Sequence, residues 1–195
     1  MKSYRLRDKE GEKMKKFELT AEYVTNIFGK KLFRIKALVE FGIVKEGELG
    51  GFVEKESNID DDGNAWVSGN AQVFGNAKIS GNAQVYGNAK VFGNAWVFGN
   101  AWISGNAQVY GNACVAENLD YAIVGGFGSE QQTITFFCQK DGSVGAKCGF
   151  FYGTLEEFRE KVLETHGESK YAQEYLMIAD LMELHFAGGK EDDER

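Results

Sequence analysis

The chain of 195 residues contains no proline and only two histidines. Its three cysteines (Cys114, Cys138 and Cys148) form no Cys-x-x-Cys pair and have no histidine at ligand spacing, so we expect neither a metal nor a cofactor. An odd number of cysteines without a secretory signal argues for reduced thiols. No apolar run approaches the roughly 18 residues of a membrane-spanning helix, and the polar N-terminus lacks the apolar core of a signal peptide. A cytoplasmic protein that does not enter membranes is therefore expected.

Charge is distributed unevenly along the chain, although the net charge is −7. Residues 1–36 are basic, whereas residues 37–62 and 117–195 are acidic. We interpret these segments as solvated surface. Because no broad basic face extends beyond the N-terminal arm, nucleic acid is not an expected partner.

Nine consecutive hexapeptides that each open with Gly-Asn-Ala fill residues 63–116. Their third residue is always Ala and their fifth is always Val or Ile. This alternation predicts a short strand with its small and branched side chains facing inward, followed by a corner. Three such strands would form one coil, and successive coils would stack at about 4.8 Å. Since one repeat cannot bury its own apolar face, the pattern predicts a solenoid.

The tract resembles the hexapeptide-repeat proteins, which fold as left-handed triangular β-helices. The resemblance implies a mainly β protein, and it favours self-association because β-helix enzymes of this type form trimers. The same small-x-aliphatic spacing occurs upstream at Gly51–Val53 and Ser57–Ile59. The longer step from Ile59 to Val67 predicts a two-residue corner insertion at Asp60–Asp62. Nearly four coils are therefore expected.

Aromatic residues occupy outward positions of the expected coils, where binding could take place. Contiguous exposed apolar surface usually marks a contact. Either flanking segments and a subunit interface cover these rings, or a host protein or small ligand binds them, and a homodimer or homotrimer would bury one face. The candidate binding residues are Trp66, Tyr86 and Trp102 on one face, Phe74, Phe92 and Tyr110 on the next, and Trp96 and Phe98 on the third.

The chain divides into four expected regions. Residues 1–48 form an arm and a capping strand near Lys31–Leu38, and residues 49–118 form the β-helix. Residues 119–189 form a small α+β module, and residues 190–195 form a flexible tail.

Three strands are expected in the module, at residues 121–124, 132–138 and 144–150. A three-residue loop with Gly142 left-handed places Phe136 opposite Ala146 and collects one apolar face, which a two-residue turn would not do.

Two helices follow the strands. Thr154 and Glu157 form a capping box for the first helix, which ends before Gly167. Leu155, Phe158, Val162 and Leu163 form the expected buried stripe of the first helix. The second helix is expected to start near Ser169 and to end at Gly188–Gly189, and it carries Tyr171, Tyr175, Ile178, Met182 and Phe186.

Three segments together resemble bacteriophage and prophage proteins of uncharacterised role. They are Leu49–Glu54, the Gly-Asn-Ala tract and Cys148–Phe158. The resemblance implies a mobile-element origin and a host cell as the setting. It transfers no catalytic residue.

Hexapeptide β-helices are known above all as acyltransferases, which resemble one another in using a histidine at the coil surface as general base. The coils of this chain contain no histidine, because His166 and His185 fall on the expected helices. Two histidines cannot supply the three zinc ligands of the carbonic-anhydrase branch. Cys114 has no accompanying base in the sequence, and Asp60–Asp62 has no spaced partner for a hard cation.

We therefore expect a non-enzymatic binding protein without cofactor, whose rigid aromatic faces engage a host protein or small ligand and could inhibit host defence. A hexapeptide-repeat acyltransferase is the first alternative. A structural virion protein is the second.

Overall fold

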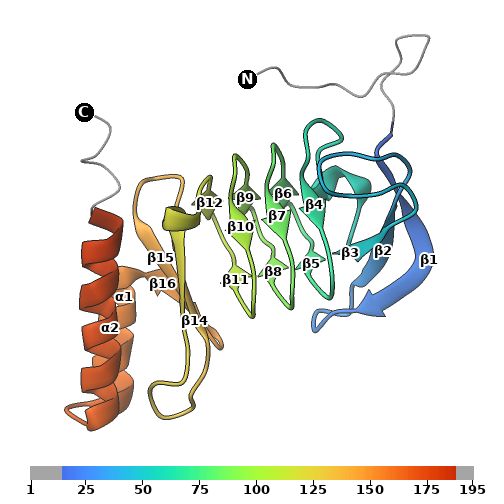
Figure 1. Cartoon of the computed structure of the whole chain (residues 1–195). Coiled ribbons are helices and arrows are strands. Elements are labelled where there is room, and N and C mark those ends of the chain that lie inside the picture. Colours follow the sequence, from blue (N-terminus) through green and yellow to red (C-terminus); the bar gives the residue numbers. More distant parts are fainter. Residues whose placement is uncertain (1–14, 188–195) are drawn as a thin grey trace, which may run out of the picture.

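The computed structural model describes residues 15–187. A β-solenoid lies between an N-terminal layer of strands and a C-terminal α+β module (Figure 1). Its strands are two residues long: β4 (Trp66–Val67), β5 (Gln72–Val73), β6 (Lys78–Ile79), β7 (Gln84–Val85), β8 (Lys90–Val91), β9 (Trp96–Val97), β10 (Trp102–Ile103), β11 (Gln108–Val109) and β12 (Cys114–Val115).

These strands stack into three parallel sheets, β4-β7-β10, β5-β8-β11 and β6-β9-β12. Val67 pairs with Val85, and Val85 pairs with Ile103, so each coil takes the predicted 18 residues. Upstream, Ile59 bridges to Ile79. Their separation in the sequence exceeds the 18-residue period by two residues, which confirms the predicted two-residue insertion. The solenoid has about four turns. Its left-handed winding stays a prediction.

The inward positions of the repeat are confirmed. Every Ala at the third position and every Val or Ile at the fifth, from Ala65 to Val115, is at most 1% exposed. These side chains form one continuous core along the solenoid axis. Because each coil contributes the same small and branched residues, the interior is filled without any large side chain from the tract.

Glycine, and not asparagine, takes the left-handed backbone conformation at the corners. The nine glycines from Gly63 to Gly111 have φ between 61° and 76°, whereas the only non-glycine residue with positive φ among residues 15–187 is Gln131. The asparagines instead form columns: the side-chain amide of Asn64 donates to the Oδ1 of Asn82 at 3.0 Å, and that of Asn82 donates to the Oδ1 of Asn100 at 3.1 Å. Five such bonds join asparagines of successive coils, so most corners are fixed both by backbone geometry and by a side-chain bond to the next coil.

A corner glycine should tolerate substitution less well than a glycine with the same φ in open space. A Cβ on Gly87 (φ 72°) would lie 3.1 Å from the backbone nitrogen of Gly105, whereas a Cβ on Gly29 (φ 75°) meets nothing within 4 Å. We expect Gly29→Ala to cost about 1 kcal/mol from left-handed strain alone, and Gly87→Ala to cost at least twice as much. Urea unfolding measures both values. Equal losses would mean that coil stacking does not constrain the corner.

The N-terminal layer extends one face of the solenoid. β1 (Phe17–Thr25) and β2 (Lys31–Ala37) pair in antiparallel fashion with each other, and β2 pairs with β3 (Leu49–Val53). The sheet then continues in the order β1-β2-β3-β5-β8-β11. The predicted strand at Lys31–Leu38 is confirmed to within one residue, and β1 was not predicted. Side chains of this layer, including Phe17 and Phe41, join the solenoid core and close its first end.

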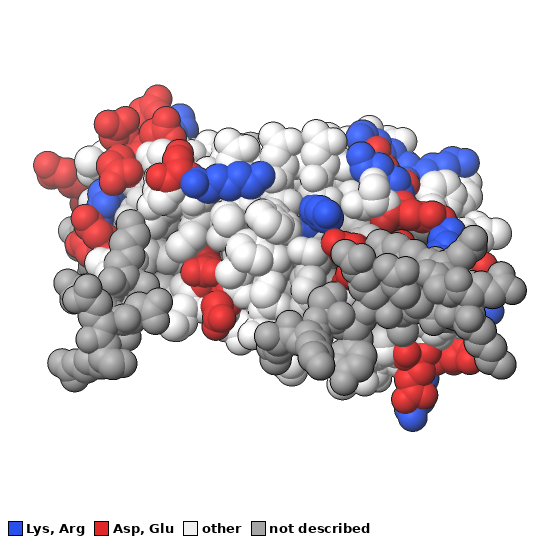
Figure 2. Space-filling view, turned by 90° about the horizontal axis from the view of Figure 1, so that it is seen from above, with Lys and Arg blue, Asp and Glu red and all other residues white. Residues whose placement is uncertain are grey.

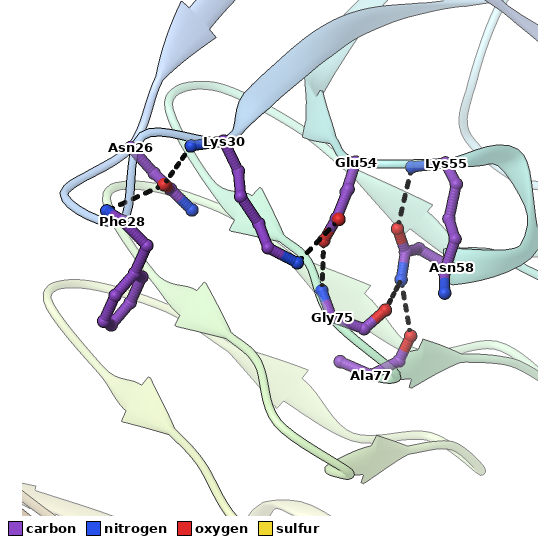
Figure 3. Close-up of polar contacts among 8 residues, drawn as sticks. All are labelled: Asn26, Phe28, Lys30, Glu54, Lys55, Asn58, Gly75 and Ala77. Carbon is purple, nitrogen blue, oxygen red and sulfur yellow. Dashed lines mark hydrogen bonds and ion pairs between the residues drawn. The ribbon is translucent and has the colours of Figure 1, made fainter.

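Polar contacts fasten this layer to the first coil (Figure 3). The Glu54 carboxylate accepts hydrogen bonds from the Gly75 N–H at 2.6 Å and from Lys30 Nζ at 2.8 Å. Beside it, in the 3-10 turn Glu56–Asn58, the fully buried Asn58 amide donates to the carbonyl oxygens of Gly75 and Ala77. Partial burial alone would raise the pKa of Glu54, but the hydrogen bonds and nearby lysines outweigh it, so the pKa lies below its usual value.

This lowered pKa predicts a pH-dependent contribution to stability. The ionised Glu54 contributes fully above its unfolded pKa of about 4.5, and the contribution is lost as the pH falls through the lower folded value. At pH 7, Glu54→Gln should lower the free energy of unfolding by about 1 kcal/mol. Below about pH 4.5 the difference from the parent should shrink. Unfolding measured from pH 7 to pH 3, with the exposed Glu40→Gln as control, tests this; a constant difference would contradict it.

The C-terminal module contains four strands and two helices. These are β13 (Tyr121–Val124), β14 (Ile134–Cys138), β15 (Val144–Cys148), β16 (Phe151–Thr154), α1 (Leu155–His166) and α2 (Lys170–Ala187), after a 3-10 turn at Asn118–Asp120. The predicted register is confirmed, since Phe136 faces Ala146 and Gly142 is left-handed. β16 was missed because Gly149 and Phe150 form a two-residue turn that reverses the chain. None of the helices in residues 15–187 is long and apolar enough to cross a membrane.

The capping box at Thr154 and Glu157 is confirmed, and so is the end of α1 before Gly167. One expected buried position of the first helix was wrong: Leu163 is 51% exposed, because it lies at the edge of the buried stripe. On α2, Tyr175, Ile178 and Met182 are buried, whereas Tyr171 is 44% exposed. The expected helix end at Gly188 and the tail at residues 190–195 lie outside the described residues.

The module closes the second end of the solenoid. The fully buried Phe137 of β14 joins the solenoid core, and the Thr135 hydroxyl accepts a hydrogen bond from the Gln108 N–H at 2.9 Å. Both open ends of the stacked coils are thus covered by their own chain, which prevents end-to-end growth.

Candidate functional site

Trp66 is not part of the exposed surface, contrary to the prediction. It is 2% exposed, and its ring packs edge-on against Phe17 and Phe41, with centroids 6.4 Å and 5.4 Å away. It leaves β4 at an outward position of the repeat, but the N-terminal layer covers it. The sequence could not show this because the covering residues belong to segments outside the repeat.

The column of Phe74, Phe92 and Tyr110 is also largely covered. Its rings stack along the solenoid with centroid separations of 4.8 Å and 4.4 Å. The turn between β1 and β2 places Phe28 against both phenylalanines, which are 6% and 8% exposed. Tyr110 contacts Tyr152 of the C-terminal module. One face of the solenoid therefore anchors the flanking segments, which was the alternative expectation for these rings.

Two aromatic pairs remain accessible. Trp96 of β9 and Phe98, the residue after β9, both point outward and stack with ring centroids 4.3 Å apart. Trp96 is 39% exposed, and its indole N–H donates to the Ser80 hydroxyl at 2.9 Å. Trp102 is 52% exposed and meets the 39% exposed Tyr86 edge-on.

Trp102 and Tyr86 form one wall of a shallow notch of about 370 Å³ at the junction with the C-terminal module. The Tyr121 hydroxyl donates to the Trp102 carbonyl oxygen at 2.7 Å, and the Asn118 side chain accepts from the Trp102 N–H at 2.8 Å. These bonds hold the Trp102 backbone while the indole ring stays exposed. Ile123 completes the opposite wall.

The two pairs flank a single edge of the solenoid. β9 and β10 belong to neighbouring sheets, and the corner Gly99–Asn100 joins them. We call Tyr86, Trp96, Phe98 and Trp102 the aromatic edge. Residues 63–116 contain only two charged side chains, Lys78 and Lys90. Figure 2 shows most charges toward the ends of the molecule, and a mostly white middle in which isolated blue side chains lie. Lys78 is the strand neighbour of Trp96 and is paired with Asp60 at 3.6 Å, so the aromatic edge lies in a sparsely charged belt.

The candidate catalytic groups are dispersed. His166 ends α1 beside Tyr175, with ring centroids 5.4 Å apart, and His185 of α2 lies against Phe186. Cys114 of β12 pairs with Trp96 in the sheet and is partly buried. Within residues 15–187, no three His, Cys, Asp or Glu side chains gather closely enough to hold a metal ion.

The notch includes residues that sequence reasoning missed. Asn118, Tyr121 and Ile123 come from the segment after the last repeat, and the repeat pattern gives no information about how that segment returns to the coils. The aromatic Tyr121, close behind the last repeat, was the available signal.

A comparison with protein families agrees with this architecture. Residues 71–87 and residues 83–99 each match a model described as the YdcK beta solenoid repeat. This chain is a repeat β-helix protein. The matched stretch includes Tyr86, Trp96 and Phe98 of the aromatic edge. No curated protein matches the chain.

The buried and exposed tryptophans should respond differently to truncation. Trp66→Ala removes a fully packed ring, so we expect a loss of about 3–5 kcal/mol in the free energy of unfolding. Trp96→Ala and Trp102→Ala remove rings that are already largely solvated, and each should cost less than about 1 kcal/mol. Chemical denaturation of the three variants provides the comparison. Similar losses at all three positions would show that the exposed rings are structural.

Proposed function

We propose that this protein is a non-enzymatic binding protein whose aromatic edge engages a partner protein. The observation that carries the proposal is the pair of accessible ring clusters, Trp96 with Phe98 and Trp102 with Tyr86, on two neighbouring faces of one solenoid edge. Tryptophan and tyrosine dominate the energetic hot spots of protein interfaces. Their display on a belt with few charges fits a contact surface whose centre is poor in charged residues.

Rigidity supports this assignment. β9 pairs with β6 of the preceding coil and with β12 of the following coil. The indole N–H of Trp96 is further held by a hydrogen bond to the Ser80 hydroxyl. Rings that are fixed before binding lose little conformational entropy on association. A solenoid with both ends covered is therefore suited to serve as a preformed docking surface.

The proposed setting follows from the resemblance of the sequence to phage and prophage proteins. The partner would be a host protein in the cytoplasm, and occupation of that protein would inhibit its activity, for example in defence. Self-association into a dimer or trimer through another face is compatible with this arrangement.

A small planar ligand is the second candidate for the same surface. The notch beside Trp102 has a volume in the range of small-molecule sites and combines aromatic walls with the Asn118 and Tyr121 side chains. The two candidates differ in the residues that they require, since a ligand in the notch would not touch Trp96.

Affinity capture from a host lysate tests the proposal. The double variant Trp96→Ala/Trp102→Ala should lose the captured partner, with retained protein reduced at least tenfold, while its thermal unfolding stays close to that of the parent. Tyr171→Ala is the matched control, because Tyr171 is a similarly exposed ring on α2. Loss through Trp102→Ala alone, with Trp96→Ala unchanged, would favour the small-ligand alternative.

The enzymatic alternative makes an opposite prediction. An acyltransferase would be stabilised thermally by acyl-coenzyme A, whereas we expect no shift. A shift in the unfolding temperature together with unaltered capture by the double variant would overturn the proposal. Presence of the chain in purified virions would support the structural alternative.

A further inference from the structure

The last helix, α2, carries apolar side chains on two opposite faces. Its inner face holds the buried residues Ala172, Tyr175, Ile178, Ala179 and Met182. On the outside, Met177, Leu181 and Leu184 are 72%, 56% and 72% exposed. Because successive helical residues are about 100° apart, each of these three lies about 200° around the helix from the buried residue two positions before it. We call Met177, Leu181 and Leu184 the outer stripe.

The outer stripe has no function in the packing of its own module. Both helices lie on the side of the module sheet that faces away from the solenoid (Figure 1). All exposed residues of α1 except Leu163 are charged or polar, as expected for a helix that faces solvent. A helix that is apolar on opposite faces is normally buried on both. Residues 15–187 supply no cover for the outer stripe, so its cover belongs to another molecule.

The spacing of the outer stripe indicates the shape of this cover. Leu181 and Leu184 follow Met177 by four and seven residues, so the three side chains form one line along the helix. A line of this kind is the seam against which a second helix packs its own apolar residues.

The charges beside the outer stripe favour a basic partner. Asp180 precedes Leu181, Glu183 precedes Leu184, and both carboxylates bond to the guanidinium of Arg159, at 2.9 Å and 2.6 Å. Their side chains are 73% and 66% exposed, whereas that of Arg159 is 23% exposed. One cation therefore serves two carboxylates, and their exposed oxygens can accept further hydrogen bonds.

The helical layer as a whole has the same sign of charge. Residues 155–187 contain eight Asp and Glu and three Lys and Arg. Figure 2 shows acidic side chains gathered at the end of the molecule that carries the helices. A second copy of this chain would bring two acidic layers together, and like charges at a contact are unfavourable. A helix with basic residues beside its apolar line is attracted instead.

We propose that the outer stripe of α2 is the docking site for a basic amphipathic helix of a partner protein. Apolar side chains of the partner helix pack along Met177, Leu181 and Leu184. Its Lys or Arg side chains bond to the exposed carboxylates of Asp180 and Glu183. This surface belongs to the C-terminal module and the aromatic edge to the solenoid, so the test below is independent of the proposed function.

Two synthetic peptides of about 21 residues, or three heptads, test the proposal. Both have Leu at the a and d positions; the basic peptide has Lys at e and g, and the acidic peptide has Glu there. Fluorescence anisotropy of the labelled peptides, titrated with the full chain, measures the affinities. We expect the basic peptide to bind about tenfold or more tightly than the acidic one. Equal affinities, or no binding of either peptide, would refute the proposal.

A triple variant identifies the apolar contribution. Met177→Gln/Leu181→Gln/Leu184→Gln removes the outer stripe without a change in charge, and because Gln is a good helix former the fold should be retained. Binding of the basic peptide should weaken about tenfold or more. The control is Ile27→Gln/Ile43→Gln, since both isoleucines are at least 80% exposed in the N-terminal layer. Unchanged affinity of the triple variant would mean that charge alone attracts the peptide.

A double variant identifies the charge contribution. Asp180→Asn/Glu183→Gln should weaken the basic peptide severalfold. Glu160→Gln/Glu164→Gln removes the same charge from exposed positions of α1 and is the matched control. If both doubles lose equal affinity, the attraction is long-range and the site is wrongly assigned.

Sedimentation of the chain without peptide tests the other occupant of the outer stripe. We expect the parent and the triple variant to have the same oligomeric state. A dimer that forms with rising concentration and is abolished in the triple variant would show that a second copy covers the stripe, against the proposal.

Discussion

The stacking of one corner glycine on the next is the constraint on which the rest of this structure depends. Gly87, for example, has φ 72° and approaches the backbone of Gly105 so closely that a Cβ would lie 3.1 Å from its nitrogen. This approach sets the spacing at which the Asn88 N–H bonds to the Gly105 carbonyl oxygen at 2.9 Å. With each corner in register, every outward residue falls into a column, and the positions of the aromatic rings follow.

The flanking segments decide which of these columns remain accessible. The N-terminal layer uses Phe17, Phe28 and Phe41 to cover Trp66 and the Phe74–Phe92 stack, and the C-terminal module seals the far end with Phe137. Burial of these rings stabilises the contacts between the solenoid and its covers by the hydrophobic effect. The aromatic edge is what remains, and its two ring pairs are the basis of the proposed binding role.

The repeat allowed much of the solenoid to be predicted, because a fixed period determines which side chains face inward. The pairing of Val53 with Val73 and the insertion near Asp60–Asp62 followed from the same rule. The burial of Trp66 could not be predicted, since it depends on contacts with Phe17 and Phe41 that no local pattern encodes. The turn at Gly149–Phe150 was missed for a different reason: the apolar run continues through it, so the strand reversal left no break in hydrophobicity.

Fluorescence quenching of individual tryptophans tests most directly whether the stacked coils bury one tryptophan and display two. In the double variant Trp96→Phe/Trp102→Phe, only Trp66 emits, and acrylamide should quench it weakly. In Trp66→Phe, both remaining indoles should be quenched strongly, as expected for rings that are 39% and 52% exposed. Strong quenching of Trp66, or protection of Trp96 and Trp102, would contradict the account.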